Sequence, residues 1–169
     1  MNIKKFLFGE KVKNILAIDI APSGLQVVKV ECLGNKVGVQ DWYETKNEPD
    51  ILSRTYSIHN PDICIVDWMP CGIAVENFQK ACENVLKVRY TLRTETEHKL
   101  RNKTMSVVRP VVKEEFDFSK YVFSGRKIGT RDFIKFNETW KDDTNPYKHC
   151  FYWIDTYLRL QGYWKNSLT

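Results

Sequence analysis

The sequence predicts an α/β domain in which helices flank one mixed sheet, with three antiparallel strands followed by parallel strands. Three observations support this prediction. Up to residue 43, three apolar, alternating segments follow one another through tight turns, which is typical of an antiparallel meander. Residues 62–92 then show the pattern strand, amphipathic helix, strand, which indicates a parallel βαβ unit. An aromatic-rich amphipathic segment near the C-terminus predicts a final helix.

The bulk composition predicts one domain. A chain of 169 residues is long enough for one well-buried core and too short for two domains of ordinary size. We expect a single domain over residues 14–165, preceded by a basic lead-in or linker over residues 1–13. No apolar run approaches the roughly 20 residues of a membrane span, so we expect no membrane partner. Five cysteines without CxxC spacing indicate neither a disulfide framework nor a zinc ribbon, and we expect a cytoplasmic protein.

The first half of the chain supplies the meander and a short helix. The first strand carries Asp19 within an apolar run, and a turn through Pro22 and Gly24 leads to a second strand at 25–32. A Gly-Asn turn then precedes the third strand at 36–43. The acids and the proline at 48–50 favour a helix over 51–59, which Pro61 brings to an end.

The second half alternates strands and helices. A short β-branched strand at 62–67 ends on Asp67 and leads through a helix at 73–85 to a strand at 86–92. Thr94 and Glu97 fit a capping box, so we expect a polar helix over 94–108 that stops near Pro110. One or two extended pieces are expected within 111–129, a mildly helical segment at 131–140, and the final helix from 147 to about Gly162.

Asp19 and Asp67 are the candidate catalytic residues. A buried strand rarely carries an acid without a structural or chemical reason. The element order β-β-β-α-β-α-β-α, with acids at the ends of the first and fourth strands, resembles the ribonuclease H-like fold, in which those two strands are neighbours. Two carboxylates so close usually share a hard divalent cation such as Mg²⁺ or Mn²⁺. A site of this kind hydrolyses phosphodiesters with two metal ions.

Three segments resemble the nuclease domain of the large terminase subunit of tailed bacteriophages: ILAIDIAPSG, PDICIVDWMPCGIAVENF and NPYKHCFYWIDTYLRL. The resemblance implies a metal-dependent endodeoxyribonuclease that cuts concatemeric viral DNA during genome packaging, in the cytoplasm of a host cell. It assigns the third metal ligand to His149, which follows Lys148 where the family usually has Asp-His or Asp-Asp. It also implies double-stranded DNA, a packaging ATPase, the small terminase subunit and the portal as partners. The family's ATPase is absent here, because no G-x-x-x-x-G-K-[ST] motif is found.

Several alternatives stay open. Asp155 or the loop acids Asp142 and Asp143 could replace His149 as the third ligand. Another ribonuclease H-like nuclease, such as a Holliday-junction resolvase, is the second reading, and an actin-like nucleotide-binding fragment is the third. The aromatic side chains of the last helix favour core packing over base stacking. The basic residues proposed to contact DNA phosphates are Arg93, Arg101, Lys103, Arg126 and Lys127.

Overall fold

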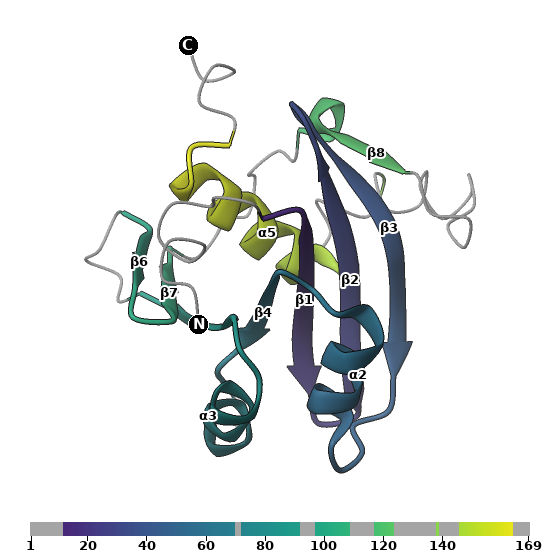
Figure 1. Ribbon diagram of the computed structural model, residues 1–169, viewed down its shortest axis with the longest axis vertical. Helices are drawn as coiled ribbons and strands as arrows, with labels where there is room; N and C mark the ends of the chain where they lie inside the picture. Colours follow the sequence, from purple (N-terminus) through teal and green to yellow (C-terminus); the bar gives the residue numbers. More distant parts are fainter. Residues whose placement is uncertain are drawn as a thin grey trace.

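The computed structural model describes residues 12–69, 72–91, 97–108, 117–123, 138 and 146–163. These residues form an eight-stranded mixed sheet with helices on both faces (Figure 1). The strand order is β6-β7-β5-β4-β1-β2-β3-β8. The predicted fold class, a mixed α/β sheet of antiparallel and parallel strands flanked by helices, is confirmed.

The strands are β1 (Asn14–Ala21), β2 (Gly24–Leu33), β3 (Lys36–Thr45), β4 (Ile63–Asp67), β5 (Val85–Tyr90), β6 (Lys99–Arg101), β7 (Thr104–Val107) and β8 (Tyr121–Phe123). The helices are α2 (Ile51–His59), α3 (Gly72–Ala81) and α5 (Lys148–Leu160), with a short 3₁₀ helix η1 (Phe118–Lys120). None of the helices among the described residues is long and apolar enough to cross a membrane.

The centre of the sheet is built around β1. This strand pairs antiparallel with β2 along its whole length and parallel with β4 on its other side. β4 is in turn parallel to β5, with α3 as the connection between them. The antiparallel meander, the βαβ unit and the contact between the first and fourth strands were therefore predicted correctly.

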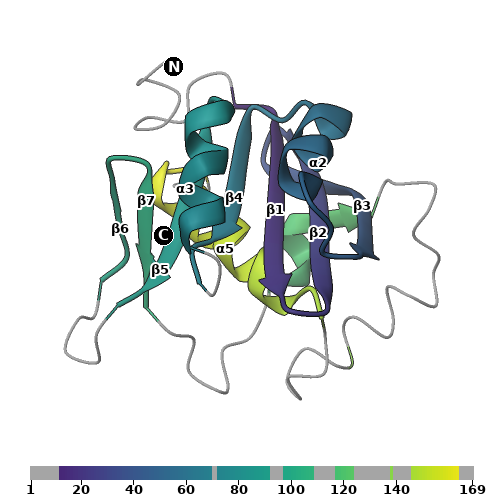
Figure 2. The ribbon, with the colours of Figure 1, turned by 90° about the horizontal axis from the view of Figure 1, so that it is seen from below.

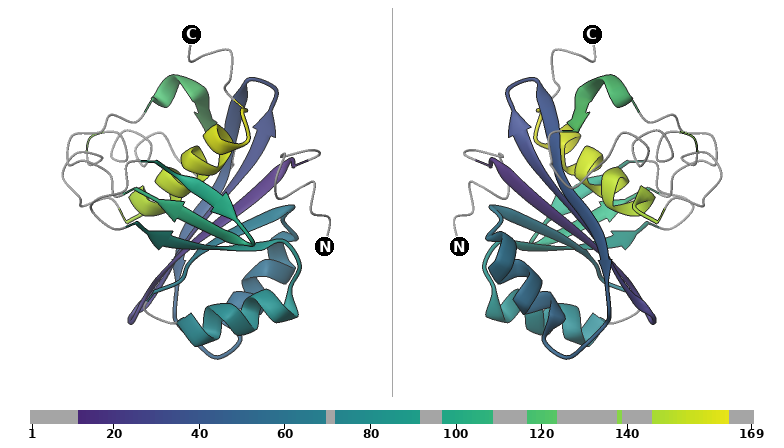
Figure 3. Two further views of the ribbon diagram at one scale, coloured as in Figure 1. Left: turned by 90° about the vertical axis from the view of Figure 1, so that its left-hand side faces the viewer. Right: turned by 90° about the vertical axis from the view of Figure 1, so that its right-hand side faces the viewer.

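The two faces of the sheet carry separate halves of the core. Ile15 and Ala17 of β1 belong to the cluster that packs against α5, whereas Leu16 and Ile18 belong to the cluster under α2 and α3. This alternation follows from the period of two along a strand. Figure 3 shows the same arrangement edge-on, with α5 on one side of the sheet and α2 and α3 on the other. The parity of a residue along its strand therefore decides which helix it faces.

The predicted helix over 94–108 is wrong for its described part, residues 97–108. These residues form the antiparallel hairpin of β6 and β7. Asn102 and Lys103 both have positive φ, 49° and 61°, as a tight two-residue hairpin turn requires. Met105 and Val107 are buried while Thr104 and Ser106 between them are not, which is the period of a strand. The alternation and the Asn-containing turn outweighed the capping-box pattern.

Other predictions differ in their bounds or lie beyond the described residues. Helix α3 begins at Gly72 and ends at Ala81, four residues earlier than the predicted end at 85. A Cβ at Gly72 would lie 2.9 Å from Nε1 of Trp68, so glycine permits this close start. β8 confirms one of the extended pieces expected within 111–129, and it pairs parallel with β3. The helix expected at 131–140 lies outside the described residues apart from residue 138.

Candidate active site

Asp19 and Asp67 occupy matching positions on the two central parallel strands. The last paired residues of β1 and β4 are Ile18 and Val66, and each aspartate is the next residue along its strand. Ile65 of β4, like Ala17 of β1, packs against α5, so the two aspartates lie on that same face of the sheet. Neighbouring strands are about 4.8 Å apart. The fold thus brings together two acids that are far apart in the sequence.

The two carboxylates differ in their surroundings. Desolvation by burial raises the pKa of Asp19 from 3.8 to about 6. Within the described part of the chain, no hydrogen bond or ion pair reaches its carboxylate. Oδ1 of Asp67, by contrast, accepts a hydrogen bond from the backbone N–H of Met69 at 3.2 Å, in the turn that follows β4. Asp19 is therefore a partly buried acid without a compensating partner among these residues.

The first turn of α5 lies over the aspartates. Cys150 is fully buried, and its Sγ donates to the backbone carbonyl of Gln26 at 3.5 Å. Burial is the main reason why the pKa of Cys150 is well above its usual value, and the negative charges of Asp19 and Asp67 raise it further. The charges of both carboxylates are thus felt at Cys150, in the first turn of this helix.

His149, the exposed residue before Cys150, is bound to Tyr90 of β5. The Tyr90 hydroxyl and His149 Nδ1 are 2.9 Å apart, and Trp153 Nε1 donates to the same hydroxyl at 3.2 Å. Trp153 is fully buried, so its indole holds the Tyr90 hydroxyl in position from the core side. Tyr90 has the strand parity of Val88 and Leu86, which face α5. The resulting chain Trp153–Tyr90–His149 engages Nδ1 of the imidazole.

The residues present fit a divalent cation only in part. Two carboxylates on adjacent strands are the oxygen ligands that Mg²⁺ and Mn²⁺ prefer. Over residues 12–69, 72–91, 97–108, 117–123, 138 and 146–163, however, no three His, Cys, Asp or Glu side chains form a group that could hold a metal ion. Asp19 and Asp67 therefore come together, and His149 does not complete a three-ligand cluster with them. The metal role of these residues stays a prediction.

Asp155, one of the alternative third ligands, lies away from the two aspartates. Asp155 accepts hydrogen bonds from Tyr121 at 3.1 Å and from Nε of Arg159 at 2.6 Å. Tyr121 belongs to β8, at the β3 edge of the sheet and away from β1 and β4. Asp142 and Asp143 lie outside the described residues.

A polar recess next to Asp19 was missed by the sequence analysis. Gln26 pairs with Asp19 across the first hairpin, and Glu44 of β3 pairs with Gln26. Both share the face of Asp19, because Val28 and Trp42, two positions along, pack against α5. The open recess has a volume of about 430 Å³ and is lined by Ser23, Gly24, Gln26, Glu44, Thr45 and Lys46. Counting residue pairs outward from the hairpin turn would have placed Gln26 beside Asp19.

The aromatic residues of α5 are core residues, as predicted. Phe151, Trp153 and Tyr157 are fully buried. Base stacking by these three side chains is thereby excluded in this conformation. Trp164, the fourth aromatic residue considered, lies outside the described residues.

Of the five basic residues proposed to contact DNA, two are described. Arg101 is exposed at the end of β6, and Lys103 occupies the adjoining turn, where its carbonyl accepts from Gln79 of α3 at 3.0 Å. The other three, Arg93, Arg126 and Lys127, lie outside the described residues. Arg101 points to the α3 face, because Leu100 beside it packs in the cluster under α5. It is therefore on the opposite face from the aspartates.

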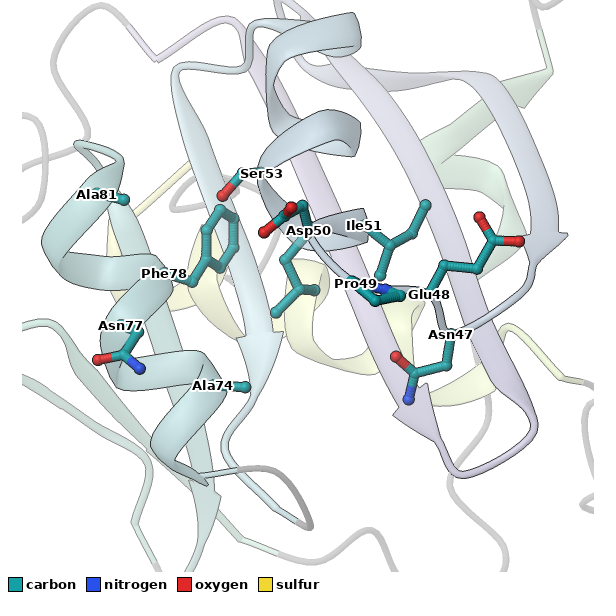
Figure 4. Close-up of a pocket in the computed structure, with 11 residues that line it drawn as sticks. Asn47, Glu48, Pro49, Asp50, Ile51, Ser53, Ala74, Asn77, Phe78 and Ala81 are labelled. Carbon is teal, nitrogen blue, oxygen red and sulfur yellow. The ribbon is translucent and has the colours of Figure 1, made fainter.

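The groove between α2 and α3 is a larger cavity without the predicted site residues. Figure 4 shows Phe78 of α3 and Ile51 of α2 on its two sides, with Asp50 drawn between them and Glu48 beyond Ile51. Its volume is about 630 Å³. The lining residues are Asn47, Glu48, Pro49, Asp50, Ile51, Leu52, Ser53, Ala74, Asn77, Phe78 and Ala81. Because α2 and α3 cover the opposite face of the sheet from α5, this groove is separate from Asp19 and Asp67 (Figure 3).

Comparisons with known proteins give limited information. No protein-family model matches the sequence, and no curated protein matches it. Among solved structures, the fold is similar to RuvC from T. thermophilus, described in complex with a Holliday junction substrate. The match has 15% sequence identity and a TM-score of 0.33, and it covers 44% of this chain and 62% of the RuvC chain, which is less than two thirds of that protein. The strand order and register, rather than this likeness, define the fold.

Proposed function

We propose that this protein is a metal-dependent nuclease that hydrolyses phosphodiester bonds in DNA, with Asp19 and Asp67 as metal ligands. One observation supports the proposal above the others: two acids follow the last paired residues of adjacent central strands, on one face of the sheet. Carboxylates in such positions repel each other unless a cation lies between them. Desolvation of Asp19 adds to this cost, which a bound divalent cation would offset.

In the proposed hydrolysis, the cation would activate the phosphate and the water, and Asp19 and Asp67 would hold the cation. A divalent ion held by Asp19 and Asp67 would polarise a phosphoryl oxygen and lower the pKa of a bound water. The desolvated Asp19 carboxylate is deprotonated above about pH 6 and is then available as a ligand. Its partial burial also limits competition from bulk water for that carboxylate. Asp67 is oriented by the backbone N–H of Met69, which donates to its Oδ1.

Although the described residues form no three-ligand group without a cation, His149 is the proposed third ligand when a cation is bound, and Tyr90 is proposed to orient it. The tyrosine engages Nδ1, so Nε2 is the nitrogen that would face a cation. Ligating histidines commonly bind an oxygen group through their other nitrogen, which fixes the ring orientation. Two ions of Mg²⁺ or Mn²⁺ are proposed. An imidazole ligand favours Mn²⁺ over Mg²⁺.

At a finer level, we propose the terminase type of nuclease over residues 14–165. This part of the proposal is supported by the three sequence segments that resemble that family, ILAIDIAPSG, PDICIVDWMPCGIAVENF and NPYKHCFYWIDTYLRL. The substrate is then concatemeric double-stranded DNA, and the partners are a packaging ATPase, the small terminase subunit and the portal. The protein acts in the cytoplasm of the infected cell.

Plasmid cleavage tests the nuclease proposal. We expect the wild-type protein to nick supercoiled plasmid with Mn²⁺ or Mg²⁺ and to be inactive in EDTA. Asp67→Asn keeps the shape of the side chain and removes its charge, so the cleavage rate should fall at least about 100-fold. Asp50→Asn is the matched control, because Asp50 is exposed on the opposite face and makes no side-chain cap for α2. Equal cleavage rates for wild type and Asp67→Asn would refute the proposal.

The choice of DNA substrate tests the finer proposal. A terminase-type enzyme should cut linear and supercoiled duplexes at similar rates. A resolvase should instead cut a four-way junction in preference to a duplex of the same sequence. A junction preference would reject the terminase assignment and leave the nuclease assignment intact.

Substitutions at His149 and Tyr90 test the third ligand. His149→Ala should lower the cleavage rate with Mn²⁺ more than with Mg²⁺, because the nitrogen ligand is lost. Tyr90→Phe removes the hydroxyl that engages Nδ1. Substitution of a residue that orients a metal-ligating histidine lowers activity or metal affinity by roughly 10- to 100-fold. Cleavage rates are measured against the concentration of each metal. Full activity of His149→Ala would move the third role to Asp142 or Asp143.

A further inference from the structure

We propose that the face of β5, β7 and β6 on the same side of the sheet as α3 is a second binding surface, which holds the phosphate backbone of nucleic acid. This surface, the basic tile, consists of Lys87, Arg89, Lys99, Arg101, Thr104 and Ser106. It rests on and deepens the proposed nuclease function, as a contact to the DNA backbone outside the cleavage site, and it can be tested without cleavage. Only Arg101 of this group was singled out from the sequence.

The strand register arranges the tile in two rows. Lys87 of β5 pairs with Thr104 of β7, which pairs on its other side with Arg101 of β6. Each row therefore places a hydroxyl between two cations. Rows are about 6.6 Å apart and neighbouring strands about 4.8 Å apart.

The second row repeats the first. Arg89 of β5 pairs with Ser106 of β7, and Ser106 pairs with Lys99 of β6. The order is again cation, hydroxyl, cation. Four cations and two hydroxyls thus form a regular array on one face.

Strand parity shows that this array faces away from α5. Val88, Met105 and Leu100, which alternate with the tile residues on the three strands, pack in the cluster under α5. The tile therefore lies on the face that carries α3. Figure 2 shows α3 in front of β4 and β5, while β7 and β6 extend beside it. In that view no described helix lies in front of β7 and β6, and Arg89, Lys99 and Arg101 are exposed.

Three of the four cations have no anionic partner in the described part of the chain. Lys87 is paired with Glu76 of α3 at 3.5 Å, and its Nζ lies 5.4 Å from the centre of the Trp68 ring. Arg89, Lys99 and Arg101 form no ion pair there. Clustered like charges repel each other and need a stabilising partner of opposite charge. The tile is therefore best suited to an anion.

The composition of the tile identifies the class of anion. Arginine, lysine, serine and threonine side chains are the groups that contact DNA phosphates, and such contacts carry no sequence information. Several cations spread over two rows suit a run of phosphates better than a single small anion. The row of Arg89 also lies one residue beyond Val88, which pairs with Asp67. Tile and aspartates therefore share one end of the sheet, although they face opposite sides.

Salt-dependent binding tests the tile. The probe is a short fluorescein-labelled duplex, and its affinity for the full chain is measured in EDTA by fluorescence anisotropy at several salt concentrations. For the triple variant Arg89→Gln, Lys99→Gln, Arg101→Gln, the slope of log affinity against log salt should become shallower by about 3. Affinity at about 0.1 M salt should fall roughly tenfold or more.

A charge-matched variant serves as control. Lys13→Gln, Lys36→Gln, Lys80→Gln removes the same charge from exposed positions outside the tile, so its slope should change by less than that of the tile variant. Equal slopes for the two triple variants, or binding of the wild type to anionic phosphatidylserine vesicles in place of the duplex, would overturn the proposal. If the tile variant shows the shallower slope but the wild type does not cleave plasmid, only the nuclease proposal is rejected. If the wild type cleaves plasmid but the tile variant has an unchanged slope, only the binding-surface proposal is rejected.

Discussion

Asp19→Asn is expected to make the metal-free protein more stable at about pH 8 while it abolishes cleavage. Desolvation raises the pKa of Asp19 from 3.8 in a solvated chain to about 6 in the fold. Between these two values the folded state holds a proton that the unfolded state has released, so stability falls as the pH rises through that window. Above about pH 6 the whole cost of ionising a buried carboxyl is present, and it amounts to roughly 2–3 kcal/mol.

Urea unfolding at two pH values measures this effect. In EDTA at about pH 8, Asp19→Asn should unfold at a free energy roughly 2–3 kcal/mol above wild type, because asparagine cannot ionise. Near pH 4 the difference should shrink, since the wild-type carboxyl is then protonated in the fold. Asp50→Asn, at an exposed position, should show no comparable gain. Equal stabilities of Asp19→Asn and wild type at pH 8 would mean that the carboxylate is hydrated in solution.

The activity of Asp19→Asn should move in the other direction. Loss of a carboxylate ligand should lower the plasmid cleavage rate by at least about 100-fold. Mn²⁺ should also stabilise the wild-type protein at pH 8 and stabilise the variant less, because binding to the folded state raises its unfolding free energy. A variant that is both less stable and inactive would indicate damage to the fold rather than loss of a ligand.

Trp153→Ala is expected to give the largest loss of stability. The indole is fully buried between α5 and the sheet, and its Nε1 donates to the hydroxyl of Tyr90 in β5. Truncation of a buried tryptophan costs about 3–5 kcal/mol through lost apolar contacts and the cavity that remains. Thermal and urea unfolding measure this loss. Ile58→Ala, at a side chain that is 75% exposed, should change stability by less than about 0.5 kcal/mol.

A milder substitution separates packing from hydrogen bonding. Trp153→Phe keeps much of the apolar bulk and removes the donor to Tyr90, so it should cost less than Trp153→Ala. The imidazole of His149 should then be held less firmly, since its tyrosine partner has lost its support. A loss for Trp153→Ala no greater than that for Ile58→Ala would show that α5 does not dock on the sheet in solution.

The centre of the fold was predictable because its signals are local. Alternation in the first three strands, and a helix between two apolar segments, predicted the meander and the βαβ unit. The resemblance of this element order to the ribonuclease H-like fold then placed β1 beside β4. The position of Asp19 next to Asp67 followed from that order alone. The segment 97–108 was mispredicted because two cap-like residues were given more weight than the alternation of Met105 and Val107.

The surroundings of the two aspartates were less predictable, because they depend on contacts between distant segments. Tyr90 and His149 meet only when α5 lies across β5, and no residue pattern along the chain shows this. Gln26 could have been found from the hairpin register. The tile also depends on β6 and β7, so the mispredicted helix concealed it.

The two edges of the sheet bear on how the protein behaves at high concentration. Among the described strands, β6 and β8 are the outermost, and each has only three residues. Short edges that carry charged side chains discourage edge-to-edge pairing between copies, which is a common route to aggregation. Lys99 and Arg101 thus also protect the β6 edge against pairing with the edge strand of another copy. Replacing these two residues with apolar ones should promote self-association, whereas the glutamine substitutions of the triple variant keep the edge polar.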